Sequence, residues 1–170
     1  MVNPETQPEL TVVQIMRTNV PSVAPGATIG AVARLLVEER LPGVPVIDGG
    51  ELVGIVTEAD LIAREADISV PTVVPFLDAI FVADAGEPFA EDLRRVTALT
   101  AGELMTSPVL SVRSTASLQQ VATLMIEERV NPIPVVDETL TLVGIVSRAD
   151  LVRVIARLES ESDDSPPALP

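Results

Sequence analysis

A short pattern, a hydroxyl residue followed three positions later by Asp, occurs twice after a Gly-Ile-Val run: Thr57-Glu-Ala-Asp60 and Ser147-Arg-Ala-Asp150. This hydroxyl-x-x-Asp motif has the spacing of a capping box, in which both side chains hydrogen-bond free backbone N–H groups at a helix start. The same geometry suits a ligand. A helix N-terminus attracts an anion, the hydroxyl can reach a phosphate or ribose oxygen, and the carboxylate can accept from both hydroxyls of a ribose. The motif alone is compatible with both interpretations.

The rest of the composition restricts catalytic chemistry. The chain has no Cys, His, Lys, Trp or Tyr, which excludes thiol and imidazole nucleophiles, lysine Schiff bases and Cys or His metal ligands. Carboxylates, hydroxyls, backbone amides and arginines remain, and this set suits binding better than catalysis. We therefore predict that the protein is not an enzyme and has neither catalytic residues nor a metal site. An enzyme acting on nucleotides would have only carboxylates to work with.

Charge and hydrophobicity restrict the partners and the location. The net charge of −14 disfavours unassisted binding to nucleic acid or to an anionic membrane, because both need a basic surface. The N-terminal segment has no basic and apolar regions of a secretion signal. The most hydrophobic stretch, residues 68–85, is interrupted by Pro71, Pro75 and Asp78 and is not expected to span a bilayer. These features predict a cytoplasmic protein.

The motif belongs to a longer internal repeat. Residues 16–61 resemble residues 105–151, and equivalent positions such as Met16 and Met105 lie 89 apart, or 90 apart after a one-residue insertion in the last turn. Self-similarity of this kind predicts two copies of one supersecondary unit that pack together, usually about a pseudo-twofold axis.

Each copy predicts the same order of elements, helix-β-α-β-β-α. Capping boxes at Thr11 and Thr100 predict short opening helices, each followed by an extended stretch. Apolar residues at helical spacing predict longer helices after Thr28 and Ser117. Two short apolar runs around a turn then predict a pair of strands, and a final helix follows. The expected strands cover residues 44–47, 52–56, 133–136 and 142–146, and the final helices begin near Ala59 and Ala149.

Between the copies lies an insertion that is longer than a simple connection requires. Phe89, Leu93 and Val96 lie at i, i+4 and i+7 within it and predict an amphipathic helix. The insertion either packs over the chain's own core or forms a dimer contact, a lid or a docking patch. It contains the only aromatic residues of the chain, which are Phe76, Phe81 and Phe89.

The Pro-Val-(Ile/Val)-Asp segment, the Gly-Ile-Val-(Thr/Ser)-x-x-Asp ending, the pairing and the unit length resemble the CBS domain, a regulatory unit named after cystathionine beta-synthase, and specifically a tandem CBS pair. In that family two α/β units pack through their sheets about a pseudo-twofold axis. The resemblance implies CBS unit 1 at residues 11–65, an inserted linker with an amphipathic helix at 66–99, CBS unit 2 at 100–157 and a disordered acidic tail at 158–170.

The resemblance also implies the site residues. Members of the family have two clefts that commonly bind adenosine-containing ligands, and the motif Asp usually holds the ribose. Asp60 and Asp150 match these ribose ligands, and Thr57 and Ser147 match the hydroxyls near ribose or phosphate. The surface expected to face the base, with two less firmly matched threonines near the unit starts, comprises Leu41, Pro42, Gly43, Val44, Val130, Asn131, Pro132, Ile133, Thr18 and Thr106.

The two clefts are expected to be inequivalent. Arg148, beside Ser147, is either a solvated surface arginine or a contact for a phosphate, whereas its counterpart Glu58 could not bind one. With a net charge of −14, a triphosphate is expected to need Mg²⁺ or another cation, and AMP to need less help.

The function implied by the resemblance is a ligand-sensing regulatory module that binds AMP, ADP or ATP. A bound ligand would shift the population toward one arrangement of the units, and a regulated protein or another copy of the chain would respond to it. Two alternatives remain: a structural or oligomerisation adaptor with empty clefts, and a sensor of another adenosyl ligand, such as S-adenosylmethionine, NAD or a cyclic dinucleotide.

Assembly is also predicted. Tandem pairs of this family often form flat homodimers through helices of each unit, and the helices ending in Glu-Glu-Arg carry apolar residues, Leu35 and Leu124, beyond one inward stripe. Aromatic residues are frequent anchors at interfaces. We therefore predict a C2 homodimer with the linker at or beside the contact.

Overall fold

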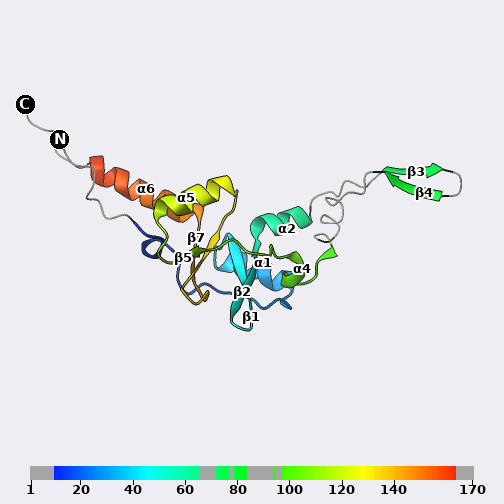
Figure 1. The fold of residues 1–170 in the computed structure, drawn as a ribbon, viewed down its shortest axis with the longest axis horizontal. Helices are drawn as coiled ribbons and strands as arrows, with labels where there is room; N and C mark the ends of the chain where they lie inside the picture. The colour runs from blue at the N-terminus through cyan, green and yellow to red at the C-terminus, as the bar shows by residue number, and fades with distance from the viewer. Residues whose placement is uncertain (1–9, 66–71, 77–78, 84–93, 95–96, 164–170) are drawn as a thin grey trace, which may run out of the picture. The chain divides into compact units, whose positions relative to one another are not determined.

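The computed structural model describes residues 10–65, 72–76, 79–83, 94 and 97–163 (Figure 1). The predicted order of elements is confirmed in both repeats, except that the first strand of the first repeat is reduced to a single parallel bridge between Val23 and Val46. The first repeat contains η1 (Val12–Gln14), α1 (Ile29–Glu38), β1 (Gly43–Asp48), β2 (Glu51–Thr57) and α2 (Glu58–Arg64). The second contains α4 (Ala101–Leu104), β5 (Val112–Arg113), α5 (Leu118–Glu127), β6 (Ile133–Val136), β7 (Leu142–Val146) and α6 (Arg148–Asp163).

The strands form small separate sheets. Strand β1 pairs with β2, while β5, β6 and β7 form a three-stranded sheet in that order. Strands β5 and β6 are parallel, and β6 and β7 are antiparallel with Ile133 opposite Val146. In both repeats the last strand leads directly into the last helix, so the hydroxyl-x-x-Asp motif lies at that junction.

The helices begin where the capping residues predict. At the start of α5 the N–H of Gln120 donates to Ser117 Oγ at 3.2 Å, and the Gln120 side chain accepts from the N–H of Ser117 at 2.9 Å. Thr28 Oγ1 accepts from the N–H of Ala31 at the start of α1. These contacts satisfy backbone groups that a helix leaves unpaired at its first turn.

Glu103 caps the opening helix of the second repeat with a charge. Its Oε2 accepts from the N–H groups of Leu99 at 2.7 Å and Thr100 at 3.1 Å. These two backbone hydrogen bonds favour the carboxylate and lower the pKa of Glu103 below its ordinary value of 4.5. Since the folded-state pKa is depressed, the stabilisation by Glu103 is full above the unfolded pKa and is lost as pH falls through the folded one. The equivalent residue of the first repeat is the uncharged Gln14.

We expect Glu103→Gln to lower the free energy of unfolding near neutral pH, because an uncharged amide accepts more weakly than a carboxylate. The difference from the wild type should shrink as pH falls through the depressed folded-state pKa of Glu103, where the carboxylate becomes protonated. Urea unfolding at several pH values measures it. Gln14→Ala is the control, and its effect should not vary across these pH values. A Glu103→Gln difference that stays constant would contradict the assignment.

The chain divides into two compact units that exchange their opening segments. The repeat-1 unit comprises Pro21–Gly49 and Val53–Val109, and the repeat-2 unit comprises Met1–Val20, Gly50–Leu52 and Leu110–Pro170. The short helix η1 of the first repeat therefore belongs to the unit built by the second repeat, and α4 belongs to the unit built by the first.

Backbone hydrogen bonds hold the exchanged segments. In the repeat-2 unit, Arg17 and Ile145 exchange two bonds of 2.8 and 3.0 Å beside β7. In the repeat-1 unit, Thr106 and Ile55 exchange two bonds of 2.9 and 3.2 Å beside β2. Each opening segment thus lies against the strand that leads into a hydroxyl-x-x-Asp motif.

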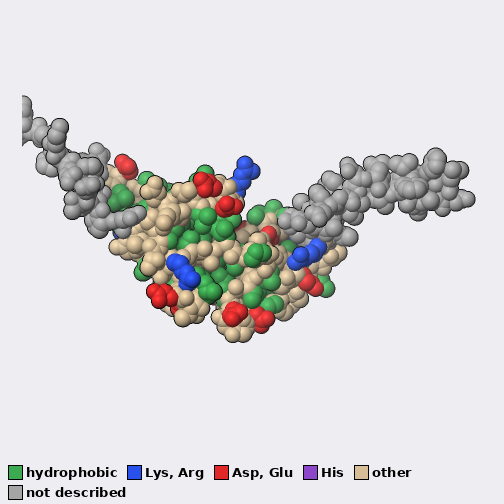
Figure 2. Space-filling model, in the orientation of Figure 1, with side chains coloured by type: hydrophobic (Ala, Val, Ile, Leu, Met, Phe, Trp, Pro, Cys, Tyr) green, Lys and Arg blue, Asp and Glu red, His purple; other side chains and the backbone are tan. Residues whose placement is uncertain are grey.

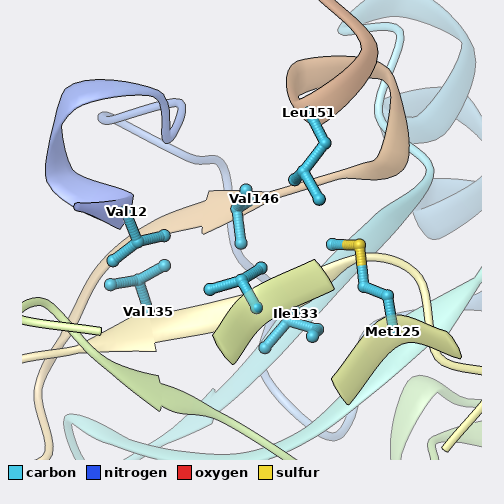
Figure 3. Packing of buried hydrophobic residues seen from close by; sticks show 7 residues of the cluster. Val12, Met125, Ile133, Val135, Val146 and Leu151 are labelled. Carbon is cyan, nitrogen blue, oxygen red and sulfur yellow. The ribbon is translucent and has the colours of Figure 1, made fainter. Parts of the chain in front are cut away.

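The core of the repeat-2 unit shows why the exchange is stable. Figure 3 shows Val12 of η1 facing Val135 and Val146 of the sheet, with Leu151 of α6 and Met125 of α5 completing the cluster. Val12 is fully buried. Burying a valine side chain contributes about 1.5–3 kcal/mol relative to its exposed state. The buried cluster comprises Val12, Val121, Met125, Ile133, Val135, Val146 and Leu151.

On the long helices α1 and α5, the apolar residues that remain exposed are not the predicted Leu35 and Leu124. Leu124 packs against the buried cluster and Leu35 is half-buried, because the inward apolar stripe of a globular helix is about 100° wide or more. The exposed apolar residues are their neighbours Val37 and Ile126, which occupy equivalent positions and are 78 % and 74 % exposed.

The insertion contains a β-hairpin that the sequence analysis did not predict. Strands β3 (Thr72–Phe76) and β4 (Ala79–Ala83) are antiparallel, with Thr72 opposite Ala83 and Pro75 opposite Ile80. The predicted amphipathic helix at Phe89, Leu93 and Val96 lies outside the described residues. Helix α6 continues to Asp163 and so enters the segment predicted to be a tail.

Candidate functional site

The first motif forms a complete capping box at the junction of β2 and α2. The N–H and the hydroxyl of Thr57 both donate to Asp60 Oδ2, each at 2.7 Å, and the N–H of Asp60 reaches Thr57 Oγ1 at 3.4 Å. One carboxylate oxygen is therefore fully engaged in positioning the helix, while Asp60 Oδ1 has no hydrogen-bond partner among the described residues.

The second motif repeats this geometry at the junction of β7 and α6. The N–H and hydroxyl of Ser147 donate to Asp150 Oδ2 at 2.8 and 2.6 Å. Here the other carboxylate oxygen is also engaged, because Arg153 Nη1 donates to Asp150 Oδ1 at 2.7 Å. The equivalent of Arg153 in the first repeat is Ala63.

The segments predicted to face an adenine base lie beside the motifs within each unit. The N–H of Glu58 donates to the carbonyl of Pro42 at 3.2 Å, and the N–H of Arg148 donates to Asn131 Oδ1 at 2.9 Å. The side chains of Leu41, Val44 and Ile133 are fully buried in their own units. Gly43 and Pro132 are also buried, and Val130 packs against the core cluster. These segments can therefore contact a ligand mainly through their backbone groups and through the partly exposed Pro42 and Asn131.

The two threonines near the unit starts occupy different structural positions. Thr106 is exposed, and its backbone pairs with Ile55, two residues before the first motif. In the first repeat the residue equivalent to Thr106 is Arg17 and not Thr18. Arg17 pairs with Ile145. Thr18 is one residue farther along the chain and is also exposed.

Arg148 is held on its own unit. Its Nη2 donates to the carbonyl of Met125, in the last turn of α5, at 3.3 Å. A phosphate contact by Arg148 would have to compete with this bond.

Metal sites and membrane-spanning helices are two further possibilities. Within the described ranges, no group of three or more Asp or Glu side chains could hold a metal ion. No helix in the part of the chain that the structure describes is long and apolar enough to cross a membrane.

The match to a family model decides the classification. The CBS domain model matches residues 12–67 and 101–157, which cover both repeats and both motifs. The chain belongs to the CBS domain family. Its fold is accordingly the mixed α/β fold of a tandem CBS pair.

Relatives of known structure share this fold. The chain is 31 % identical over 158 residues to the "CBS domain-containing protein CBSX2, chloroplastic" of Arabidopsis thaliana, covering 88 % of this chain and 64 % of that protein. It therefore spans less than two thirds of the plant protein's length. A crystal structure of CBSX2 in complex with AMP matches with a TM-score of 0.71 and 29 % identity, over 88 % of this chain and 99 % of that one. The CBS pair of protein MJ0100, crystallised with 5'-methylthioadenosine and S-adenosyl-L-methionine, matches at 23 % identity and a TM-score of 0.66, over 89 % of this chain and 99 % of that one; this likeness shows the fold alone.

Two residues near the CBS motifs were missed by the sequence analysis. Arg153 engages Asp150, and Arg64, in the last turn of α2, has a buried Nε without a hydrogen-bond partner. Comparison of the two repeats could have found both, because Arg153 aligns with Ala63, and Arg64 aligns with the apolar Val154.

Proposed function

We propose that this chain is a non-catalytic regulatory module that binds an adenine nucleotide, with AMP as the preferred ligand, at the hydroxyl-x-x-Asp motifs of its CBS units. The observation that supports this most strongly is the Asp60 carboxylate, whose Oδ2 is fixed by Thr57 while its Oδ1 is left to accept hydrogen bonds. A similar chain, CBSX2, was crystallised in complex with AMP.

The capping bonds prepare the carboxylate for a ribose. Two donors from Thr57 hold Asp60 in one orientation, so less conformational entropy is lost when a ligand binds. A carboxylate accepts from hydroxyl groups more strongly than a neutral oxygen does. The Pro42 carbonyl already accepts from the N–H of Glu58, which keeps the base-facing segment beside the ribose position.

Regulation would follow from differential binding. A ligand shifts a conformational equilibrium only by the difference between its affinities for the two states. We propose that AMP favours one conformation of the chain, and that a regulated protein or a second copy of the chain binds that conformation. We also propose a cytoplasmic location; the name of the plant relative places that protein in the chloroplast.

Thermal unfolding with a panel of ligands tests the proposal. AMP should raise the melting temperature in a saturable way, since a ligand at 100 times its Kd stabilises by about 2.7 kcal/mol. GMP is the control for the base. ATP in EDTA should shift the melting temperature less than AMP, and added Mg²⁺ should reduce the difference because it offsets phosphate charge. A response to S-adenosylmethionine alone would favour the alternative adenosyl ligand, and no response to any of these compounds would favour the adaptor.

We further propose that the chain forms a C2 homodimer through the helix pairs of its CBS units. Exposed apolar residues occur at equivalent positions in both: Val37 and Ile62 on α1 and α2, Ile126 and Val152 on α5 and α6. All four are more than 60 % exposed. Hydrophobic side chains, drawn green, reach the surface of the described part in Figure 2. Apolar residues repeated on both units suit a symmetric, self-complementary contact.

Val37→Glu combined with Ile126→Glu should convert the dimer to a monomer, because the substitutions bring charge into an apolar contact. Light scattering at tens of micromolar measures the mass. The control is Leu99→Glu with Leu140→Glu, which adds the same charge at exposed apolar positions outside these helices. A wild-type monomer, with or without AMP, would refute the dimer. If the chain with Val37→Glu and Ile126→Glu is still a dimer, the contact lies elsewhere. Phe76→Ala with Phe81→Ala would then test whether the linker forms it.

A further inference from the structure

The two hydroxyl-x-x-Asp motifs differ in whether Oδ1 of the Asp has a hydrogen-bond partner. Asp150 Oδ1 accepts from Arg153 Nη1 at 2.7 Å, and the Asp150 side chain is only 14 % exposed. In the first motif Ala63 replaces this arginine, and Asp60 Oδ1 has neither a hydrogen bond nor an ion pair with any described residue. The first motif therefore has a free acceptor that the second motif lacks.

A free donor lies on the same helix as the free acceptor. Arg64 Nε is buried and has no hydrogen-bond partner, and the ion pair of this residue is a 3.9 Å contact with the largely exposed Glu65. A buried N–H without an acceptor is unfavourable, whereas an exposed ion pair of this length contributes little. In the second repeat the equivalent residue is Val154, which is buried in the core. The unsatisfied arginine Nε is thus specific to the first repeat.

The helix brings the acceptor and the donor together. Asp60 and Arg64 are four residues apart, so they lie on one face of α2 with Cβ atoms about 5–6 Å apart. Helical side chains generally lean toward the N-terminus, which is the direction in which Asp60 lies from Arg64. No ion pair joins the two residues within the part of the chain that the structure describes. One ligand that donates hydroxyl groups and carries an anion could satisfy both.

We infer that the first repeat carries the principal nucleotide site, in which Asp60 Oδ1 accepts from the ribose and Arg64 donates to the 5'-phosphate of a nucleoside monophosphate. The inference rests on the proposed function. The second motif binds the same ligand more weakly, because the ribose must displace Arg153 from Asp150. Arg153 then sets the difference in affinity between the two sites, although it does not contact the ligand in the first site.

Calorimetric titration of the full chain with AMP and with adenosine tests this assignment. The wild type should bind one AMP per chain with the higher affinity. Arg64→Met keeps the length of the side chain and removes its charge, and it should weaken AMP binding about ten-fold or more while leaving adenosine binding unchanged. Arg157→Met, which removes an exposed arginine from α6, is the control and should change neither.

Arg153→Ala should leave the first site unchanged and strengthen binding of a second AMP. Two equivalent sites in the wild type would overturn the inference, as would an Arg64→Met variant in which AMP and adenosine affinities fall together or do not fall at all. Absence of AMP binding to the wild type has a different meaning, because it would refute the proposed function itself.

Discussion

Asp60→Ala should lower the affinity for AMP ten- to hundred-fold while reducing the free energy of unfolding by only about 1 kcal/mol. Hydrogen bonds to a charged acceptor contribute about 1.5–3 kcal/mol, which gives the change in affinity. The loss of stability comes from the capping bonds to Thr57. Titration calorimetry and urea unfolding measure the two quantities separately. Asp150→Ala should reduce stability to a similar extent with little effect on the principal site.

A matched control separates capping from binding. Gln120 has the same N3 role at the start of α5, where it accepts from the N–H of Ser117, but it lies outside both motifs. Gln120→Ala should therefore reduce stability and leave AMP affinity unchanged. If Asp60→Ala behaves like Gln120→Ala, the first motif is only a helix cap.

Gly144→Ala should destabilise the chain by about 1–3 kcal/mol through overpacking. A Cβ atom at this position would lie 2.7 Å from the carbonyl oxygen of Arg17 and 2.8 Å from Met16 Sδ. The carbonyl is held in place because it accepts from the N–H of Ile145 at 3.0 Å. Relief of the clash requires the exchanged opening segment to move away from β7. Thermal or urea unfolding of the variant measures the loss.

The equivalent glycine gives the comparison. The three atoms nearest to a Cβ atom on Gly54 all belong to the flexible side chain of Met105, so Gly54→Ala should cost less than Gly144→Ala. Met105→Ala should largely relieve Gly54→Ala, whereas Met16→Ala should relieve Gly144→Ala only in part, since the Arg17 carbonyl remains. Equal losses at the two glycines would contradict the described pairing of Arg17 with Ile145.

Most elements were predictable because their signals are local. Ser117 and Gln120 identify the start of α5 by their spacing alone, and the hydroxyl-x-x-Asp motifs indicate both the last helices and the candidate site. The exchange of opening segments was not predicted, because it depends on where Val12 finds a core and not on any pattern around it. The hairpin of β3 and β4 was missed for another reason: Pro75 interrupts an otherwise strand-like run, and proline is unusual inside a sheet.

The candidate site was predicted in part. Thr57 and Asp60 were found by their spacing, and the structure adds how they are used: one carboxylate oxygen caps the helix and the other is open. The proposed contribution of Arg64 to phosphate binding could not be inferred from the sequence of α2, because a basic residue in the last turn is common in helices. Comparison with the equivalent Val154 of the second repeat marks Arg64 as unusual, and the structure adds that its buried Nε has no hydrogen-bond partner.

The most direct measurement of the central claim is a crystal structure of this chain grown with AMP. The account predicts one well-ordered AMP per chain at the first repeat, with its ribose hydroxyls within hydrogen-bond distance of Asp60 and its phosphate on Arg64. Crystals grown at saturating AMP in which no nucleotide contacts Asp60 would contradict it, even if a nucleotide contacts Asp150.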